Sequence, residues 1–159
     1  MNIITATATI EELGPLSRIV VRYCELIESR AKAKGSSAAD WVPLAELVAV
    51  EDFERVGAYQ EVMTWGEYVR FLSEWAGATR FETTVHRITE VGRVVFQEIE
   101  ERHFKGEEFI RKNVIAVYEF DEGHKIRHLD IYEQARDTGR WIVTAARASL
   151  DPTSASEMS

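Results

Sequence analysis

The segment from Val94 to Phe104 carries the most concentrated set of acid–base side chains in the sequence, in an order unusual for a β-strand. Glu98, Glu100 and Arg102 recur at every second position, so they would share one face of a strand. Two carboxylates that lie so close raise each other's pKa, whereas a neighbouring guanidinium lowers it. Such a trio could supply a general acid or base.

The alternation leaves open which face of this segment points inward. The opposite face would carry Val95, Gln97, Ile99, Glu101 and His103, and neither face is cleanly apolar. On charge content alone, a solvated face joined by ion pairs is the commoner explanation for the face that carries Glu98.

Histidines offer a second source of proton transfer, because the imidazole titrates near neutral pH. His86 falls in the middle of a predicted strand, where a single histidine is more often a structural residue. His128 and Asp130 share a strand face, but no third ligand stands at a recognisable spacing, so we predict no metal site. The sequence has no glycine-rich phosphate loop and no nucleophile elbow, and we expect no cofactor.

Three helices are predicted in the first half of the chain. Gly14-Pro15 begins an amphipathic helix that extends to about Lys34, and Gly35 interrupts it. A second helix is expected over residues 38–50, with Asp40 as its N-cap. Thr64 and Glu67 have the spacing of a capping box, so a third helix begins there and ends at Gly77.

The second half reads as strands separated by short turns. A short extended piece over 52–56 precedes the third helix, and the later strands cover 80–89, 93–104, 108–120 and 125–134. Because short connections favour antiparallel neighbours, we expect a meander with the helices on one face of the sheet, which is an α+β fold. Residues 1–148 would form a single domain and residues 149–159 a flexible tail.

Composition excludes several classes of partner. The chain has 159 residues and a formal net charge of −8, and such an acidic surface repels nucleic acid and anionic membranes. Its one cysteine, Cys24, excludes an intrachain disulfide and a cysteine-based zinc site, and we expect it in the core. No apolar run could span a bilayer and the first residues lack a signal peptide, so we expect a cytoplasmic protein.

Several local motifs, taken together, are similar to one known family. They are Asp40-Trp41, the capping box at 64–67, the strand segment at 81–92, and the two segments 117–126 and 129–132 near the end of the predicted sheet. Over about Leu16 to Arg136, the chain resembles the SnoaL-like branch of the NTF2-like superfamily. That group, which includes ketosteroid isomerase, scytalone dehydratase and limonene-1,2-epoxide hydrolase, has a cone in which three helices pack on a curved, mostly antiparallel sheet.

The resemblance implies a site on the strand described first. It suggests that the face with Glu98, Glu100 and Arg102 lines the cavity, with Glu98 or Glu100 as base and Arg102 tuning them or binding a substrate oxygen. His86 matches a histidine that scytalone dehydratase-like members use in proton transfer, and would be the acid or its relay. The residues expected to bind the ligand are Phe96, Phe53, Trp75, Tyr118, Leu129 and Ile131.

The resemblance also implies an activity and a partner. We expect an isomerase, dehydratase or cyclase that acts on a hydrophobic small molecule in an apolar pocket. The alternative is a ligand-binding or interaction domain without catalysis. A weaker alternative is an epoxide hydrolase with an altered site, because the catalytic arginine of limonene-1,2-epoxide hydrolase falls on Glu98 here and its last-strand catalytic aspartate falls on Ile131. A homodimer through the open sheet face is implied, with His128, Asp130 and Tyr132 on that face.

Overall fold

The computed structural model describes residues 2–3, 12–34 and 37–134. The tail predicted over 149–159 lies outside the described residues. Within the described part of the chain, no helix is long and apolar enough to cross a membrane.

The first helix, α1 (Pro15–Lys32), forms where it was predicted. Pro15 stands at its first position, where the missing N–H leaves no hydrogen bond unmade. Its buried face carries Leu16, Val20, Tyr23 and Cys24, which recur at helical spacing and pack against the sheet.

The second predicted helix is much shorter than expected. It consists of a 3₁₀ turn, η2 (Ala38–Trp41), and one α-helical turn, α2 (Val42–Ala45). The prediction of Asp40 as N-cap was wrong, because Ser37 holds that position and donates its backbone N–H to the Asp40 carboxylate at 3.0 Å. The helix stops early because the backbone N–H of Ala49 bonds to the carbonyl of Ile126 at 3.0 Å, which draws this segment to the sheet.

The third helix, α3 (Trp65–Ala78), confirms the predicted capping box. The Thr64 backbone N–H donates to the Glu67 carboxylate at 2.8 Å, and the Thr64 hydroxyl accepts from the Glu67 N–H. Trp65, Tyr68 and Leu72 form the buried stripe of the helix.

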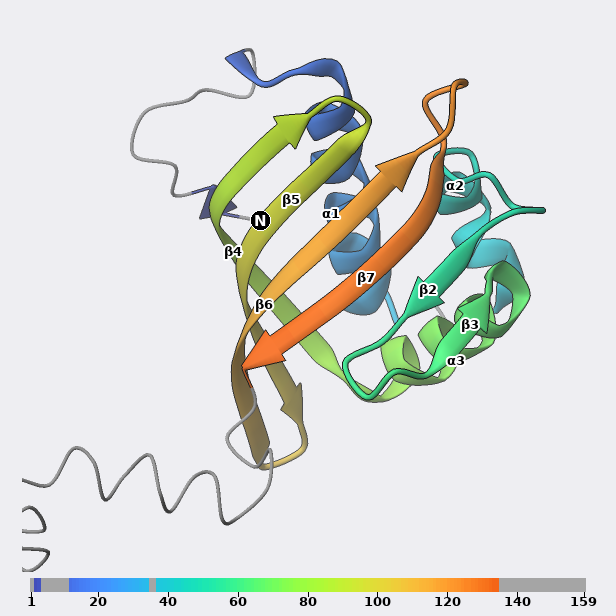
Figure 1. Ribbon diagram of the computed structural model, residues 1–159. Helices are drawn as coiled ribbons and strands as arrows, with labels where there is room; N and C mark the ends of the chain where they lie inside the picture. The colour runs from blue at the N-terminus through green and yellow to red at the C-terminus, as the bar shows by residue number, and fades with distance from the viewer. Residues whose placement is uncertain (1, 4–11, 35–36, 135–159) are drawn as a thin grey trace, which may run out of the picture.

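A seven-stranded sheet follows the order β1-β4-β5-β6-β7-β2-β3 (Figure 1). Its centre is the predicted antiparallel meander of β4 (Arg80–Val91), β5 (Val94–Lys105), β6 (Glu108–Phe120) and β7 (Ile126–Gln134). β2 (Glu54–Val56) pairs in parallel with β7 and antiparallel with β3 (Val62–Thr64), and β1 (Asn2–Ile3) pairs in parallel with β4.

The turn between β4 and β5 fixes which side chains face the helices. Val91 pairs directly with Val94, and Gly92 adopts a φ of +59°, a conformation that a two-residue hairpin turn requires. In this register Val95 and Gln97 are fully buried on the side of α1. The alternate residues of β5 therefore point to the opposite face of the sheet.

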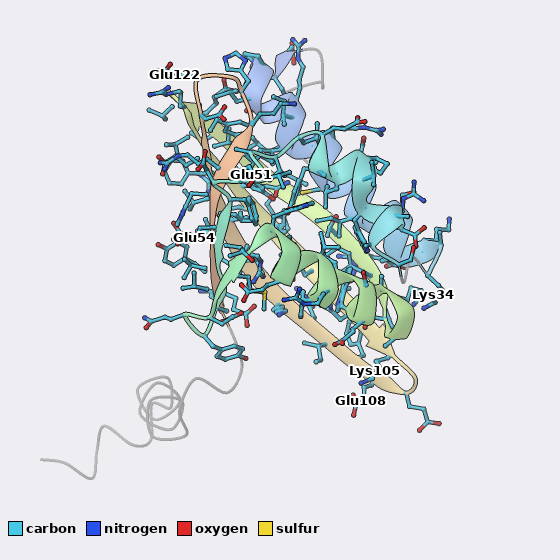
Figure 2. All side chains as sticks on the ribbon, turned by 90° about the vertical axis from the view of Figure 1, so that its right-hand side faces the viewer. Lys34, Glu51, Glu54, Lys105, Glu108 and Glu122 are labelled. Atoms are coloured by element: carbon cyan, nitrogen blue, oxygen red, sulfur yellow. The ribbon has the colours of Figure 1, made fainter. Side chains whose placement is uncertain are left out.

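The helices cover one face of the sheet, so the fold has two layers (Figure 2). The main core lies between them, with contributions from α1, η2, α2, α3 and the inner face of β5, β6 and β7. No helix of the described residues packs on the outer face, which exposes Phe96, Ile115 and Tyr132.

Candidate functional site

The predicted catalytic residues lie on the outer face of the sheet, so the expectation that they line the cone was wrong. Phe96, on the same face as Glu98, Glu100 and Arg102, is 42% exposed, whereas Gln97 on the other face is fully buried. His86 is exposed and lies at the β-bulge between Val85 and Arg87. The structure therefore separates all four predicted catalytic residues from the helix-covered side.

Ion pairs join the charged side chains of this face to one another and to the neighbouring strands. Arg102 Nη1 lies 2.8 Å from Glu100, and Arg111 Nε binds the other oxygen of the same carboxylate at 2.8 Å. Arg87 forms a two-point pair with Glu98 from the neighbouring strand. The Arg102 guanidinium lowers the pKa of Glu100, and Arg87 lowers that of Glu98. Both carboxylates are thus held as anions and are weaker bases than ordinary ones.

The residues predicted to bind ligand fall into three groups. Trp75 and Ile131 line a pocket on the helix-covered side. Phe53, Tyr118 and Leu129 are buried in the core. Phe96 is on the outer face, so its predicted orientation toward the cavity was wrong.

A small pocket lies between the inner face of the sheet and the helices, with a volume of about 140 Å³. Aromatic and aliphatic side chains dominate its wall, and several polar residues interrupt it. The lining consists of Cys24, Ile27, Arg55, Tyr68, Phe71, Leu72, Trp75, Phe81, Thr83, Ile99, Glu101, His103, Lys112, Ile131 and Glu133. We call it the inner pocket.

Polar side chains cross the inner pocket in a row from strand to strand. Thr83 of β4 pairs with Glu101 of β5, and Glu101 pairs in turn with Lys112 of β6. Lys112 Nζ then binds the Glu133 carboxylate of β7 at 2.8 Å. The Glu133 side chain is only 8% exposed, and this ammonium group is its ion-pair partner.

A second pair adjoins this row. His103 Nε2 lies 3.0 Å from Glu101 Oε2, with both side chains largely buried. The imidazole packs against two aromatic rings, with its centre 4.9 Å from that of Phe81 and 6.1 Å from that of Trp75. A carboxylate and an imidazole at this distance can exchange a proton and can deliver or remove one at a bound molecule.

A wider depression of about 460 Å³ adjoins the inner pocket and shares Phe71, Trp75, His103 and Lys112 with it. We call it the vestibule. Its far wall is the β5–β6 hairpin, whose tip carries Lys105 and Glu108 and lies near the end of α3 (Figure 2). His103 and Lys112 therefore line both the vestibule and the inner pocket.

Deeper in the core, a polar cluster links α1 to the sheet. The Gln97 side chain contacts the Cys24 sulfur at 3.3 Å, and the Tyr118 hydroxyl donates to Gln97 Oε1 at 3.3 Å. Burial raises the pKa of Cys24 to about 11 and raises that of Tyr118 as well. Both groups are therefore neutral at neutral pH, and their contacts with Gln97 join α1 to β5 and β6.

The sequence prediction missed Glu101, His103, Lys112 and Glu133 as a set. Alternation alone gave no signal for the first two, because Val95 and Ile99 on their face are matched by Phe96 and Phe104 on the other. Lys112 and Glu133 come together only through the pairing of β6 with β7. Among the described residues, no three histidine, cysteine or acidic side chains are placed to hold a metal ion.

No protein-family model matches the sequence, and no curated protein is significantly similar to it. Solved structures are similar in fold. An LEH-like epoxide hydrolase of M. tuberculosis superposes with a TM-score of 0.58 at 18% identity, over 84% of this chain and 96% of that one. An NTF2-like protein of unknown function from Exiguobacterium sp. 255-15 has a TM-score of 0.58 at 11% identity, over 73% and 98%.

A third similar structure is SalBIII, an epoxide hydrolase/cyclase-like enzyme with a role in pyran ring formation in the polyether salinomycin. It has a TM-score of 0.62 at 10% identity and covers 77% of this chain and 92% of its own. Proteins so different in sequence share with this chain the layered arrangement of helices on a curved meander. The chain therefore has the NTF2-like fold that its sequence motifs implied.

Proposed function

We propose that the protein is a small-molecule enzyme that moves protons by general acid–base catalysis in the inner pocket. The observation that carries this proposal is the Glu101–His103 pair, 3.0 Å apart, in an aromatic-lined pocket that shares His103 with the vestibule. Charged groups placed in such a pocket are costly to bury, and in enzymes they commonly serve the reaction. The substrate would be a hydrophobic carbonyl or hydroxyl compound.

Glu101 and His103 would each carry out a proton transfer in an isomerisation. The Glu101 carboxylate takes a proton from a carbon next to a carbonyl group, and the electron pair moves toward the oxygen. The proton returns to a second carbon of the same molecule, from Glu101 or through His103, so no other reactant is consumed. Lys112 lies beside this pair and could stabilise negative charge on the substrate oxygen.

Deuterium uptake from heavy water tests the proposal without knowledge of the natural substrate. Single-ring ketones and enones would be incubated with the protein, and exchange at the carbon next to the carbonyl would be followed by NMR. Glu101→Gln should reduce exchange by a factor of about 10² or more, the usual contribution of a general base. Glu98→Gln is the matched control, because it removes a carboxylate from the same strand but from the outer face.

Two results would contradict the proposal. If Glu98→Gln abolished exchange while Glu101→Gln retained it, the base would be Glu98, as the family resemblance implied, but on the outer face of the sheet. Binding of the same compounds without any exchange would favour the alternative of a non-catalytic ligand-binding domain.

A second reaction, the opening of an epoxide by water, is favoured by one observation. Two carboxylates of the inner pocket, Glu101 and Glu133, belong to strands on either side of Lys112. One carboxylate could activate water while the Lys112 ammonium, on the strand between them, donates to the epoxide oxygen. Incubation of a cyclic epoxide in ¹⁸O-labelled water would test this, since one labelled oxygen should appear in the diol and disappear with Glu133→Gln.

A further inference from the structure

Arg55 has unused hydrogen-bonding capacity among the described residues of the inner pocket. Its side chain is 13% exposed, and its Nε atom is buried without a hydrogen-bond partner. Arg55 lies on β2, opposite Leu129 of β7, and lines the inner pocket. A guanidinium group carries five N–H donors in a planar fork, so a buried one ordinarily finds oxygen acceptors.

The neighbours of Arg55 compensate its charge only partly. Within the described chain its ion pair is with Glu61, at 3.7 Å from Nη1, which is longer than a hydrogen bond. The other Glu61 oxygen accepts the backbone N–H of Tyr59 at 2.9 Å. On the pocket side the guanidinium lies over the ring of Tyr68, 4.9 Å from its centre, and 5.9 Å from that of Phe71. Aromatic faces attract a cation but accept no conventional hydrogen bond.

The negative groups of the inner pocket are engaged by other cations or donors. Glu133 is bound by Lys112 at 2.8 Å, and Glu101 is paired with His103 at 3.0 Å. A second polar atom of the wall, the Thr83 hydroxyl, is also buried without a partner. The unmatched groups of this pocket are thus a cation and a hydroxyl, and both can donate to an acidic oxygen.

The volume and the lining limit the size of the molecule. A cavity of about 150 Å³ holds a benzene ring, and the inner pocket has about 140 Å³. Tyr68, Phe71, Trp75 and Phe81 provide flat surfaces for one ring.

We propose that the inner pocket takes a single-ring carboxylic acid, with its carboxylate held by the Arg55 guanidinium and its ring between the aromatic side chains. The proposal deepens the proposed function, since this molecule would present a ring carbon to Glu101, and it rests on the same pocket. Arg55 acts as the residue that selects acids over neutral compounds of the same shape.

Binding of two matched pairs of probes tests this selection. Benzoate is compared with benzamide, and cyclohexanecarboxylate with cyclohexanecarboxamide, by calorimetric titration of the full chain at pH 7. A charge-assisted hydrogen bond is worth enough to make each acid bind at least about tenfold more tightly than its amide. Arg55→Gln should remove this preference, and Arg87→Gln, which changes an exposed arginine of the outer face, should retain it.

Each remaining outcome would overturn the proposal. These are equal binding of acid and amide, absence of binding by all four probes, and a preference that survives Arg55→Gln. If Arg55 served only to hold Glu61 in the turn after β2, then Arg55→Gln would lower the melting temperature and leave the acid preference unchanged. Should Arg55→Gln not fold, Arg55→Lys keeps the charge without the planar fork and should show a reduced preference.

The two proposals can fail separately. Binding of benzoate through Arg55 without any deuterium exchange on the ketone and enone panel would refute only the acid–base function. Exchange that depends on Glu101, together with equal binding of acids and amides, would refute only the role of Arg55.

Discussion

Replacement of Gln97 by leucine should destabilise the protein, because it leaves the buried Tyr118 hydroxyl without its hydrogen-bond acceptor. Gln97 is fully buried and accepts a hydrogen bond from the Tyr118 hydroxyl at 3.3 Å. With leucine there, that hydroxyl keeps only the Cys24 sulfur at 3.6 Å, and a buried donor without a good acceptor costs about 1–3 kcal/mol. We expect the free energy of unfolding to fall by about 2 kcal/mol.

The double variant isolates this cause. Tyr118→Phe alone should cost about 1 kcal/mol, because Gln97 Oε1 still contacts Cys24. In Gln97→Leu/Tyr118→Phe no hydroxyl is left unpaired, so the loss should be smaller than the sum of the two single losses by about 2 kcal/mol. Urea unfolding at pH 7, followed by tryptophan fluorescence and far-UV circular dichroism, measures all four proteins.

A control cycle uses a hydroxyl outside the cluster. Tyr132 is 61% exposed on the outer face, so Gln97→Leu and Tyr132→Phe should be additive within about 0.5 kcal/mol. If the losses in unfolding free energy from Gln97→Leu and Tyr118→Phe were also additive, the reasoning would be refuted. The loss in Gln97→Leu would then come from packing and not from an unpaired hydroxyl.

Three further changes test separate parts of the structure. Burial raises the pKa of the Cys24 thiol from 9.0 to about 11, so its contribution to stability is complete below pH 9 and is lost as the pH rises through 11. Between pH 8 and pH 10.5 this group should account for a loss of about 2 kcal/mol, which Cys24→Ala should remove when the two proteins are compared by urea unfolding at both pH values. Equal losses in both proteins would contradict this. Thr64→Ala should lower the free energy of unfolding by about 1 kcal/mol through loss of the α3 cap, and an unchanged urea midpoint would speak against that role. Ile115→Glu on the exposed outer face should convert the expected homodimer to a monomer in light scattering; a wild-type chain that is already monomeric would remove that expectation.

The sequence predicted the elements well because their signals are local. The helix from Pro15, the cap at Thr64 and the four long strands all depend on residues close together in the chain. The second helix was overestimated, because Ala49 bonds to Ile126, a partner 77 residues away in the sequence. The periodicity of apolar residues cannot reveal that a distant strand competes with the helix for a backbone N–H group.

The site was harder to predict because it depends on the parity of a strand. A shift of one residue moves every side chain to the other face, and the motifs fixed the position of β5 only to within such a shift. Lys112 and Glu133 are 21 residues apart, and their contact follows from the pairing of β6 with β7. Arg55 stands on a three-residue strand that carries little local signal.

The ion pairs of the outer face have a consequence for how this fold could change. A slip of β5 by one residue would carry Glu98, Glu100 and Arg102 under the helices and separate them from Arg87 and Arg111. The penalty for burying those charges protects the pocket on the other side from register errors. Substitutions that neutralise the charges of the outer face would remove this penalty. They would therefore allow a descendant protein to shift β5 by one residue and line its pocket with the side chains that now face outward.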